Sequence, residues 1–598
     1  MVGCHFCSFV IEKTKQLLRK RFALPKASFF EEAVSGFTAT ERVIFGVAGF
    51  LLLFSTVFLL SRINDLFLVE IPAHGGTLSE GIIGTPRFVN PLLSLSDADR
   101  DLSALIYSGL LKATPEGTLV PDLAESYSIS PNGLTYSFIL KENLRFHDGA
   151  PITADDVIFT IQKTEDSGLK SPKRANWEGV SAEKISEREV RLTLKQPYSP
   201  FLENATLGIL PKHIWKDADA EQFPFSPFNV HAVGSGPYKV MNIKLNSSGI
   251  PLYYELRSFK DYALGEPFIK NLVVRFYSGE KQLLDAYHRK EIESTSGIPP
   301  ATASRLSKTD VRIESTPLPR IFGVFFNQNQ APILADSSIR KALELATDKE
   351  TLVKKVLFGY GLPIDSPIPP LLLSAGTSAN ASQTMEERLD AAKKILDKAG
   401  WKENPEGGVR EFTKKKVAQE LSFSLATSNA PELKETAELL KSMWEALGAK
   451  VELKTFDVGD LNQNVIRPRK YDALLFGEII GRDLDLFAFW HSSQRNDPGL
   501  NIAMYANSKV DKLLDDGRKL LSDSDRLTLY RTVDEEIQKD IPAIFTYSPD
   551  FIYVLPEKVR GFTLDRLTIP SERFLDIEHW YTRTEKVWEV FTKYHITE

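Results

Sequence analysis

Polar and apolar residues alternate along two short segments in the first half of the chain. Residues 135–140 read TYSFIL and residues 189–195 read EVRLTLK. Tyr136, Phe138 and Leu140 share one face of the first segment, and the apolar residues of the second segment likewise share one face. A period of two residues is typical of a strand with one buried face. We therefore predict a strand over each segment, with a Pro-Asn-Gly turn at residues 131–133 before the first one.

The second half of the chain has apolar residues at intervals of three and four instead. This pattern covers residues 337–357, 385–399 and 433–447, and a glycine follows each segment within two positions. Such spacing predicts three amphipathic helices that end at glycine. The last helix leads directly into a predicted strand at residues 449–455. Strands that alternate with helices of this length indicate an α/β fold with some parallel pairing.

A third pattern is the uninterrupted apolar run at residues 43–60. The run contains no charged residue and is flanked by Arg42 and Arg62. At a rise of about 1.5 Å per residue it is about 27 Å long, close to the hydrocarbon core of a bilayer, which is about 30 Å thick. A buried core helix is one alternative, but the run lacks an amphipathic stripe. We predict a transmembrane signal anchor over these residues.

A cleaved signal peptide is the second alternative for this run. Neither an A-x-A-like cleavage site nor a lipid-accepting cysteine follows it, so we expect the helix to remain uncleaved. Basic residues gather before it: Lys13, Lys15, Arg19, Lys20, Arg21 and Lys26. By the positive-inside rule, residues 1–42 are predicted to be cytoplasmic and the bulk of the chain extracytoplasmic, in the periplasm or at the cell surface. The predicted location is the cell membrane, with a single pass.

Length and charge narrow the remaining possibilities. A chain of 598 residues is too long for one core, so we expect two or more lobes, with crossings near residues 323–327 and 542–553. Lys and Arg total 73 against 79 Asp and Glu, which gives no basic surface for nucleic acid. We expect a monomer. Cys4 and Cys7 are the only cysteines and cannot complete a zinc site by themselves, so no metal or cofactor is expected.

No catalytic motif emerges from the sequence. An H-E-x-x-H pair, a G-x-S-x-G elbow and a phosphate-binding glycine loop are all absent. His147 and Asp148 are neighbours, but Gly149 follows them, and a turn fits this text better than a catalytic pair. We therefore predict no catalytic residue and a protein that is not an enzyme.

Residues 105–161 contain a series of recognisable short motifs. They include Y-x-G-L, P-x-L-A-E-S, G-x-x-Y-x-F-x-L and F-H-D-G-x-P-x-T-A-x-D-V, in this order. Further blocks lie at residues 234–238, 325–370, 392–401, 439–453 and 471–477. Over about residues 75–590 the chain resembles the family 5 solute-binding proteins of ABC importers, whose known members bind dipeptides, oligopeptides or nickel.

The resemblance implies a two-lobed α/β fold like that of periplasmic binding proteins, of type II and cluster C. Lobe one would cover residues 70–320, with an extra subdomain at about 112–230, and lobe two would cover residues 321–548. Residues 549–598 would return to lobe one. By the same resemblance, the protein captures a peptide or similar small solute in the cleft between the lobes and delivers it to the permease subunits of an ABC transporter.

The resemblance also implies where a ligand would bind. Peptide-binding relatives offer backbone groups from a loop after the first strand to an extended ligand, as in strand addition. By position, that loop is expected at Ser79, Glu80, Gly81, Ile82 and Ile83.

The same relatives place an aspartate, in a G-W-x-x-D loop, against the amino terminus of the ligand. Here Glu478 stands at the aromatic position and no aspartate is in register, so a free amino terminus is a less secure expectation. Glu478 and Asp483 are the candidate substitutes, although Asp483 also matches a later turn of the family. Trp490 either lines the cleft or caps a helix.

Two functions other than solute import remain open. A ligand-binding sensor ectodomain that signals to a membrane partner is one, because the basic residues 13–26 can contact anionic lipid or a cytoplasmic protein. A surface hydrolase is the other, because the carboxylates of glycosidases leave no spacing signature.

Overall fold

The computed structural model describes residues 35–370, 384–404, 408–414, 417–482, 484–590 and 592. Cys4, Cys7 and Asp483 lie outside these residues. The chain divides into two compact units, one formed by residues 72–583 and the other by the residues before and after them. Each unit is described by itself.

The smaller unit contains the long apolar helix α3 (Ala39–Leu66), which has no buried residue. Thr38 and Glu41 cap its first turn, since the Thr38 backbone N–H donates to the Glu41 carboxylate over 2.8 Å. The helix includes all of the predicted run and is long and apolar enough to cross a membrane. Strand β1 (Leu68–Pro72) follows it and pairs with β23 (Thr584–Trp588).

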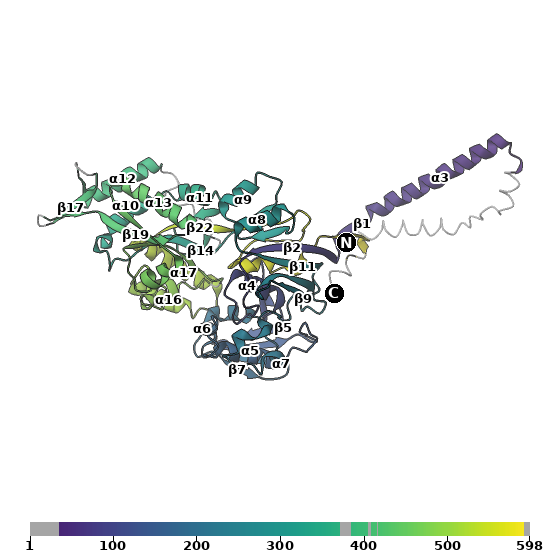
Figure 1. Ribbon diagram of the computed structural model, residues 1–598, viewed down its shortest axis with the longest axis horizontal. Helices are drawn as coiled ribbons and strands as arrows, with labels where there is room; N and C mark the ends of the chain where they lie inside the picture. Colours follow the sequence, from purple (N-terminus) through teal and green to yellow (C-terminus); the bar gives the residue numbers. More distant parts are fainter. Residues whose placement is uncertain are drawn as a thin grey trace, which may run out of the picture. The chain divides into compact units, whose positions relative to one another are not determined.

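The larger unit is built on one twelve-stranded sheet (Figure 1). Ten strands follow one another in the order β20 (Lys450–Phe456), β19 (Ser422–Ser428), β21 (Ala473–Ile479), β14 (Arg320–Phe326), β22 (Ala543–Val554), β12 (Ser294–Ser296), β2 (Gly75–Ile83), β11 (Ile269–Tyr277), β10 (Pro251–Ser258) and β9 (Tyr238–Leu245). Strands β13 (Ile313–Pro317) and β15 (Gly361–Pro363) also pair with β22. The pairs β2–β11 and β19–β20 are parallel, as expected for an α/β fold.

The two ends of this sheet have separate cores. We call the part built on β2 and β9–β12 lobe one, and the part built on β14 and β19–β21 lobe two. Lobe one packs α4 (Asp97–Ile106), α8 (Glu280–His288) and α9 (Pro300–Leu306) around its strands. The chain crosses to lobe two at Leu318–Pro319, between β13 and β14, and β22 leads back by pairing with both lobes.

In lobe two, helices cover both faces of the sheet. One face carries α10 (Ser337–Leu345), α11 (Lys349–Val356), α12 (Met385–Lys398) and α13 (Pro431–Glu445). The other face carries α16 (Ser508–Gly517) and α17 (Asp523–Asp540), and the two groups lie on opposite sides of β14 and β19 in Figure 1. Both groups bury their apolar sides against the strands, as amphipathic helices do.

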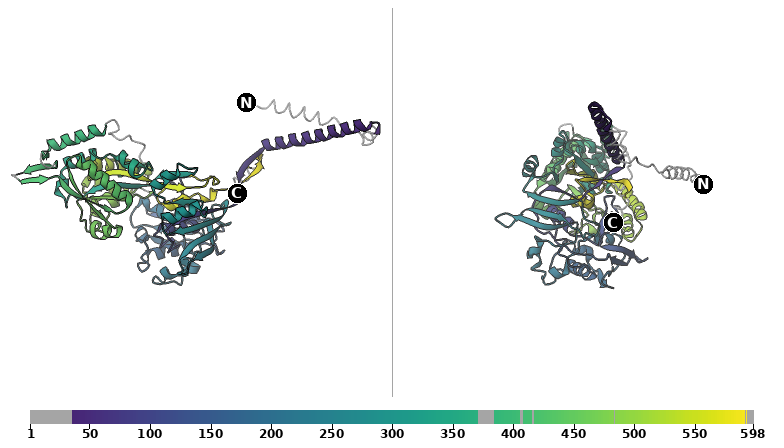
Figure 2. Two further views of the ribbon diagram at one scale, coloured as in Figure 1. Left: turned by 45° about the horizontal axis from the view of Figure 1, so that its top comes forward. Right: turned by 90° about the vertical axis from the view of Figure 1, so that its right-hand side faces the viewer.

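A second sheet of four strands stands apart from the large one and has its own core. Its order is β5 (Ala124–Ile129), β6 (Thr135–Leu140), β8 (Glu189–Thr193) and β7 (Ser181–Lys184), with α5 (Ala154–Glu165) packed on it. We call this part the small sheet; Figure 2 shows it from two further sides. Both strands predicted from alternation are confirmed as β6 and β8.

The remaining short strands complete the description. They are β3 (Leu111–Ala113), β4 (Leu119–Pro121), β16 (Lys402–Glu403), β17 (Arg410–Lys414) and β18 (Val417–Glu420). Two predicted helices are confirmed as α12 and α13, with Gly400 and Gly448 at positive φ after them. The single helix predicted over residues 337–357 is wrong, because Asp348 interrupts it: its carboxylate caps α11 by accepting from the Thr351 backbone N–H over 3.1 Å.

Candidate functional site

The segment expected to form a ligand-binding loop is the second half of strand β2, so the expected loop is wrong, whereas contact of these residues with a ligand stays a prediction. The strand lies between β11 and β12, which pair with it on both sides. The Ser79 carbonyl accepts from the Glu293 backbone N–H over 2.9 Å, and the Gly81 carbonyl accepts from Thr295 Oγ1 over 2.9 Å. The sheet therefore already uses the backbone groups of Ser79, Glu80 and Gly81, and a peptide cannot pair with these three residues as a new strand.

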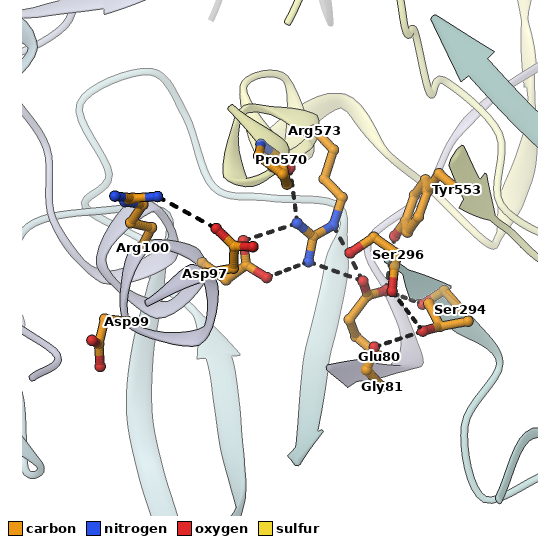
Figure 3. A network of polar contacts seen from close by, with 12 residues as sticks. Glu80, Gly81, Asp97, Asp99, Arg100, Ser294, Ser296, Tyr553, Pro570 and Arg573 are labelled. Carbon is orange, nitrogen blue, oxygen red and sulfur yellow. Dashed lines mark hydrogen bonds and ion pairs between the residues drawn. The ribbon is translucent and has the colours of Figure 1, made fainter. Parts of the chain in front are cut away.

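Glu80 belongs to a fully buried network centred on Arg573 (Figure 3). The Arg573 guanidinium donates to Glu80 Oε1 over 3.0 Å and to Asp101 Oδ2 over 2.6 Å. Tyr553 donates its hydroxyl proton to Glu80 Oε2 over 2.8 Å, and Ser294 Oγ donates to the same oxygen. The network joins β2, α4, β22 and the 3-10 helix at Pro570–Phe574, so the role of Glu80 in the structure is to tie lobe one together.

One arginine in this network faces two carboxylates. Burial raises the pKa of both Glu80 and Asp101, and the nearby positive charge of Arg573 only partly offsets that effect. Burial also acts against the charge of Arg573, but Asp101 and Glu80 outweigh it and raise the pKa of the guanidinium. Without the guanidinium of Arg573, the two buried carboxylates would have no counter-charge, which is strongly destabilising.

Two of the cavities among the described residues border both lobe one and lobe two. The first, cavity A, measures about 410 Å³ and is bordered by Arg100 of α4, by Lys173 and Glu203 beside the small sheet, and by Arg482 of lobe two. The second, cavity B, measures about 530 Å³ and lies beside the strands that cross between the lobes. Its lining includes Ile82, Ile83, Asp97, Arg320, Phe322 and Tyr547.

Arg482 connects lobe two to two parts of the chain that border cavity A. It follows β21, and its side chain is only 6% exposed. Its Nη2 lies 2.7 Å from Glu572 Oε2, and its Nε lies 3.6 Å from Glu203 Oε1. The same arginine also borders a third cavity of about 570 Å³, between the small sheet and α17.

Further contacts hold lobe two against the small sheet. The Ser199 backbone N–H donates to the Arg518 carbonyl over 3.1 Å, and Arg526 donates to Ser199 Oγ. The Arg518 guanidinium also lies 5.6 Å from the ring centre of Tyr198, within cation–π range. Lobe two and the small sheet are thus in direct contact beside the third cavity.

Two cations in cavity A lack a matching buried anion. The Arg100 guanidinium has Asp97 as its ion-pair partner, at 3.4 Å on an exposed surface. For Lys173 Nζ, no ion pair or hydrogen bond is found among the described residues. Lys173 is open to the cavity, yet the protein around it partly excludes water, and this burial together with repulsion from Arg100 lowers its pKa, against the attraction of Glu203. The pair favours an anionic group between them.

Asp122 lies at the wall of the same cavity and is 3% exposed. Its Oδ1 has no hydrogen-bond partner among the described residues. Burial raises the pKa of Asp122 to about 7, although Lys112 acts in the opposite direction. Lys112 itself pairs with Glu578 over 2.5 Å.

Glu478 and Trp490, also expected to bind ligand, do not line cavity A or cavity B. Glu478 is 3% exposed on β21, neither carboxylate oxygen has a partner among the described residues, and burial raises its pKa well above the ordinary value. Trp490 ends α15 (Phe487–Trp490), is fully buried, and packs against Phe325 and Phe545 in the core of lobe two.

The sequence did not single out Arg100, Lys173 or Arg482. Arg482 lies in the loop after β21, where peptide-binding relatives carry an aspartate, and its positive charge at this place is the signal in the sequence that points to it. Arg100 and Lys173 are 73 positions apart and belong to no motif, so only the fold brings them together.

Comparison with known proteins identifies the class of protein to which this fold and these cavities belong. Residues 118–498 match the model of the bacterial extracellular solute-binding proteins, family 5. The chain belongs to this family, whose members are binding proteins and not enzymes. The expected resemblance is therefore confirmed, and the mixed α/β fold matches that of two-lobed periplasmic binding proteins.

Individual relatives are similar over most of their length. The oligopeptide-binding protein AppA of Bacillus subtilis is 28% identical over 517 residues, which cover 85% of this chain and 92% of AppA. Its structure in complex with a nonapeptide matches with a TM-score of 0.66 at 26% identity, over 86% of this chain and 99% of that one. The ABC transporter substrate-binding protein CtaP of Listeria monocytogenes matches with a TM-score of 0.71 at 26% identity, over 85% and 100% of the two chains.

Proposed function

We propose that this protein captures a small solute between lobe one and lobe two and delivers it to the permease subunits of an ABC importer, without catalysis. The observation that carries the proposal is cavity A, which both lobes line and which Arg482 borders while it pairs with Glu572 and Glu203. A small ligand enclosed in this way is held by few polar groups. Closure of the lobes around the ligand is the conformational change that a transporter can recognise. The nonapeptide bound to AppA supports a peptide or a similar solute.

The ligand class follows from the charges of cavity A. Arg100 and Lys173 face this cavity without a buried counter-ion, whereas Glu203 and Glu572 already face Arg482. We therefore propose that the solute directs a carboxylate or another anionic group at Arg100 and Lys173. An acidic anchor for a free amino terminus is not part of this proposal, because Glu478 lies away from the cavity. Ile82 borders cavity B and is the residue of β2 that we retain for ligand contact.

The arrangement in the cell is the second part of the proposal. α3 has the length and composition of a membrane span, and a signal sequence shares both properties. We propose that it is an uncleaved anchor, with residues 1–42 in the cytoplasm, the rest outside, and a monomeric protein. The lobes would follow the boundaries expected from the sequence, with the small sheet as the extra subdomain.

A thermal-shift experiment on the purified full-length protein tests the ligand class. The probes are a mixture of short peptides with free carboxyl termini, the same mixture as carboxyl-terminal amides, and the same mixture acetylated at the amino terminus. We expect the free and acetylated peptides to stabilise the protein and the amides to bind about tenfold more weakly or worse, as for loss of one charge-assisted hydrogen bond.

Two variants make this test specific. Lys173→Met should abolish the difference between free and amidated peptides. Lys260→Met, at an exposed lysine that lines none of the cavities described above, should preserve it. Equal stabilisation by free and amidated peptides would contradict the anionic subsite, whereas no stabilisation by any peptide would contradict the peptide-like ligand.

A further inference from the structure

Four apolar side chains are exposed together at the end of α3. Leu66 is the last residue of the helix and Phe67 follows it; they are 83% and 53% exposed. Trp588 and Val590, from the far end of the chain, are 48% and 71% exposed. We call these four residues the juxtamembrane patch. Exposed apolar clusters of this kind mark a surface that meets another apolar phase.

Backbone pairing holds the patch together. β1 and β23 form a two-stranded sheet directly after α3, and the Glu589 backbone N–H donates to the Phe67 carbonyl over 3.0 Å. The rings of Phe67 and Trp588 stack with their centres 6.2 Å apart and their planes 23° from parallel. In Figures 1 and 2 the yellow carboxyl-terminal strand lies beside the purple strand at the end of the helix. The fold thus brings Trp588 to the helix end although more than 500 residues separate them in sequence.

The position of the patch along the helix matches the interfacial layer of a bilayer. Arg62 marks the end of the apolar run, and Leu66 lies about 6 Å beyond it along the helix axis. Each interfacial layer of a bilayer is about 5–8 Å thick. Tryptophan is enriched at this depth, because its ring is apolar while its indole N–H can still meet water.

We propose that the juxtamembrane patch lies in the interfacial layer of the same bilayer that α3 spans, so that the lipid surface binds the carboxyl-terminal strand as a second attachment. The inference rests on the proposed membrane anchor. The patch is continuous with the exposed apolar surface of α3, which supplies the argument for lipid rather than protein as its partner. The neighbouring Glu585, Lys586 and Glu589 carry a net charge of −1, so they supply no attraction to anionic lipid and zwitterionic lipid is the expected partner.

The chain supplies its own probe for this proposal. Of its seven tryptophans, Trp588 alone is exposed: the other six are at most 4% exposed, and they are Trp177, Trp215, Trp401, Trp444, Trp490 and Trp580. The full-length protein is reconstituted into zwitterionic vesicles of ordinary phosphatidylcholine or of phosphatidylcholine brominated on its acyl chains, and tryptophan fluorescence is compared. Bromine quenches only rings that it contacts, so quenching reports on Trp588.

We expect fluorescence loss in the brominated vesicles, larger when the bromines lie close to the headgroup than when they lie near the chain end. Trp588→Phe keeps an aromatic ring against Phe67 and should abolish the loss. Equal fluorescence in brominated and ordinary vesicles, from protein that floats with the vesicles, would overturn the patch and leave the anchor intact. Protein that does not float with vesicles would overturn the anchor and the patch together.

Discussion

At the scale of single residues, Arg573 is the counter-ion of two buried carboxylates in lobe one. It is fully buried and neutralises Glu80 and Asp101, which lie on β2 and α4. Replacing it by methionine keeps much of the volume but leaves two carboxylates without a counter-charge. We expect Arg573→Met to lower the free energy of unfolding by about 3–5 kcal/mol, the usual cost of breaking a buried ion pair.

Urea unfolding of the two proteins measures this loss. Arg289→Met is the control, because Arg289 pairs with Glu291 on the exposed surface, and it should leave the unfolding midpoint unchanged. The loss in Arg573→Met should grow as pH rises, because burial raises the pKa of Glu80 and Asp101 and removal of the opposing Arg573 charge raises both further, so that folding of the variant requires their protonation. An unchanged midpoint for Arg573→Met would show that the network is not needed for stability.

Asp122 gives a second prediction, on the pH dependence of stability. Its pKa is about 7 in the folded protein and has an ordinary value of 3.8, so the folded state holds the proton more tightly. Stability from this group is complete below pH 4 and is lost as pH rises to about 7. We expect Asp122→Asn and the wild type to have the same melting temperature at pH 4. At pH 8 the variant should melt at a higher temperature, because its free energy of unfolding should be larger by about 4 kcal/mol.

Melting curves at pH 4, 6 and 8 check this prediction, and the increase should be partial at the intermediate pH. Glu116→Gln serves as control, because this carboxyl group is exposed and its pKa is lowered rather than raised. A shift of the same size at every pH would mean that the carboxyl of Asp122 does not titrate between the folded and unfolded states.

At the scale of elements, the spacing of apolar residues correctly predicted two strands and two helices. β6 and β8 follow from alternation alone, and α12 and α13 follow from helical spacing and their terminal glycines. The break between α10 and α11 was missed because the apolar spacing continues through Asp348, whose capping bond depends on local geometry. The position of β2 was missed because pairing on both sides is a tertiary property that no local pattern contains.

The residues of the candidate site could be predicted from the sequence less well than the helices and strands. The cleft between two lobes follows from the family resemblance, but its charges come from Arg100, Lys173 and Arg482, which lie on separate elements. The candidate residues taken from relatives, such as Glu478 and Trp490, are buried in lobe two instead. A residue's place in a cavity depends on how whole elements pack, which spacing in the sequence does not record.

The loop after β21 gives the element-scale prediction. Arg482 pairs with Glu572 and Glu203, so its loss removes both of these ion pairs between lobe two and the residues that border cavity A while leaving each core intact. We expect Arg482→Ala to shift the unliganded protein toward an open form, seen as a larger radius of gyration in solution scattering. Arg467→Ala, at an exposed arginine 3.9 Å from Asp497, is the control and should not change it. Identical scattering of wild type and Arg482→Ala would contradict a latch at this position.

At the scale of the whole molecule, the proposed orientation can be read from two natural cysteines. Cys4 and Cys7 are the only cysteines and precede α3, so the proposal places both in the cytoplasm. A membrane-impermeant maleimide should label them only after intact cells are permeabilised. Ser248→Cys, in an exposed turn after β9, should be labelled in intact cells and serves as the control.

Two results of the labelling experiment would contradict the proposed orientation or the proposed anchor. Labelling of Cys4 or Cys7 in intact cells would reverse the topology. Mature protein without either cysteine, shown by its mass, would mean that the apolar helix is removed as a signal peptide.

Capture of a solute between the lobes is the central claim, and native mass spectrometry of the protein purified without denaturation tests it most directly. We expect a mass above that of the 598-residue chain, lost on denaturation, from a released compound with an anionic group. Arg100→Met with Lys173→Met should purify without that excess mass, and Lys260→Met should retain it. A wild-type mass equal to the chain alone, unchanged after incubation with peptide mixtures, would contradict the account.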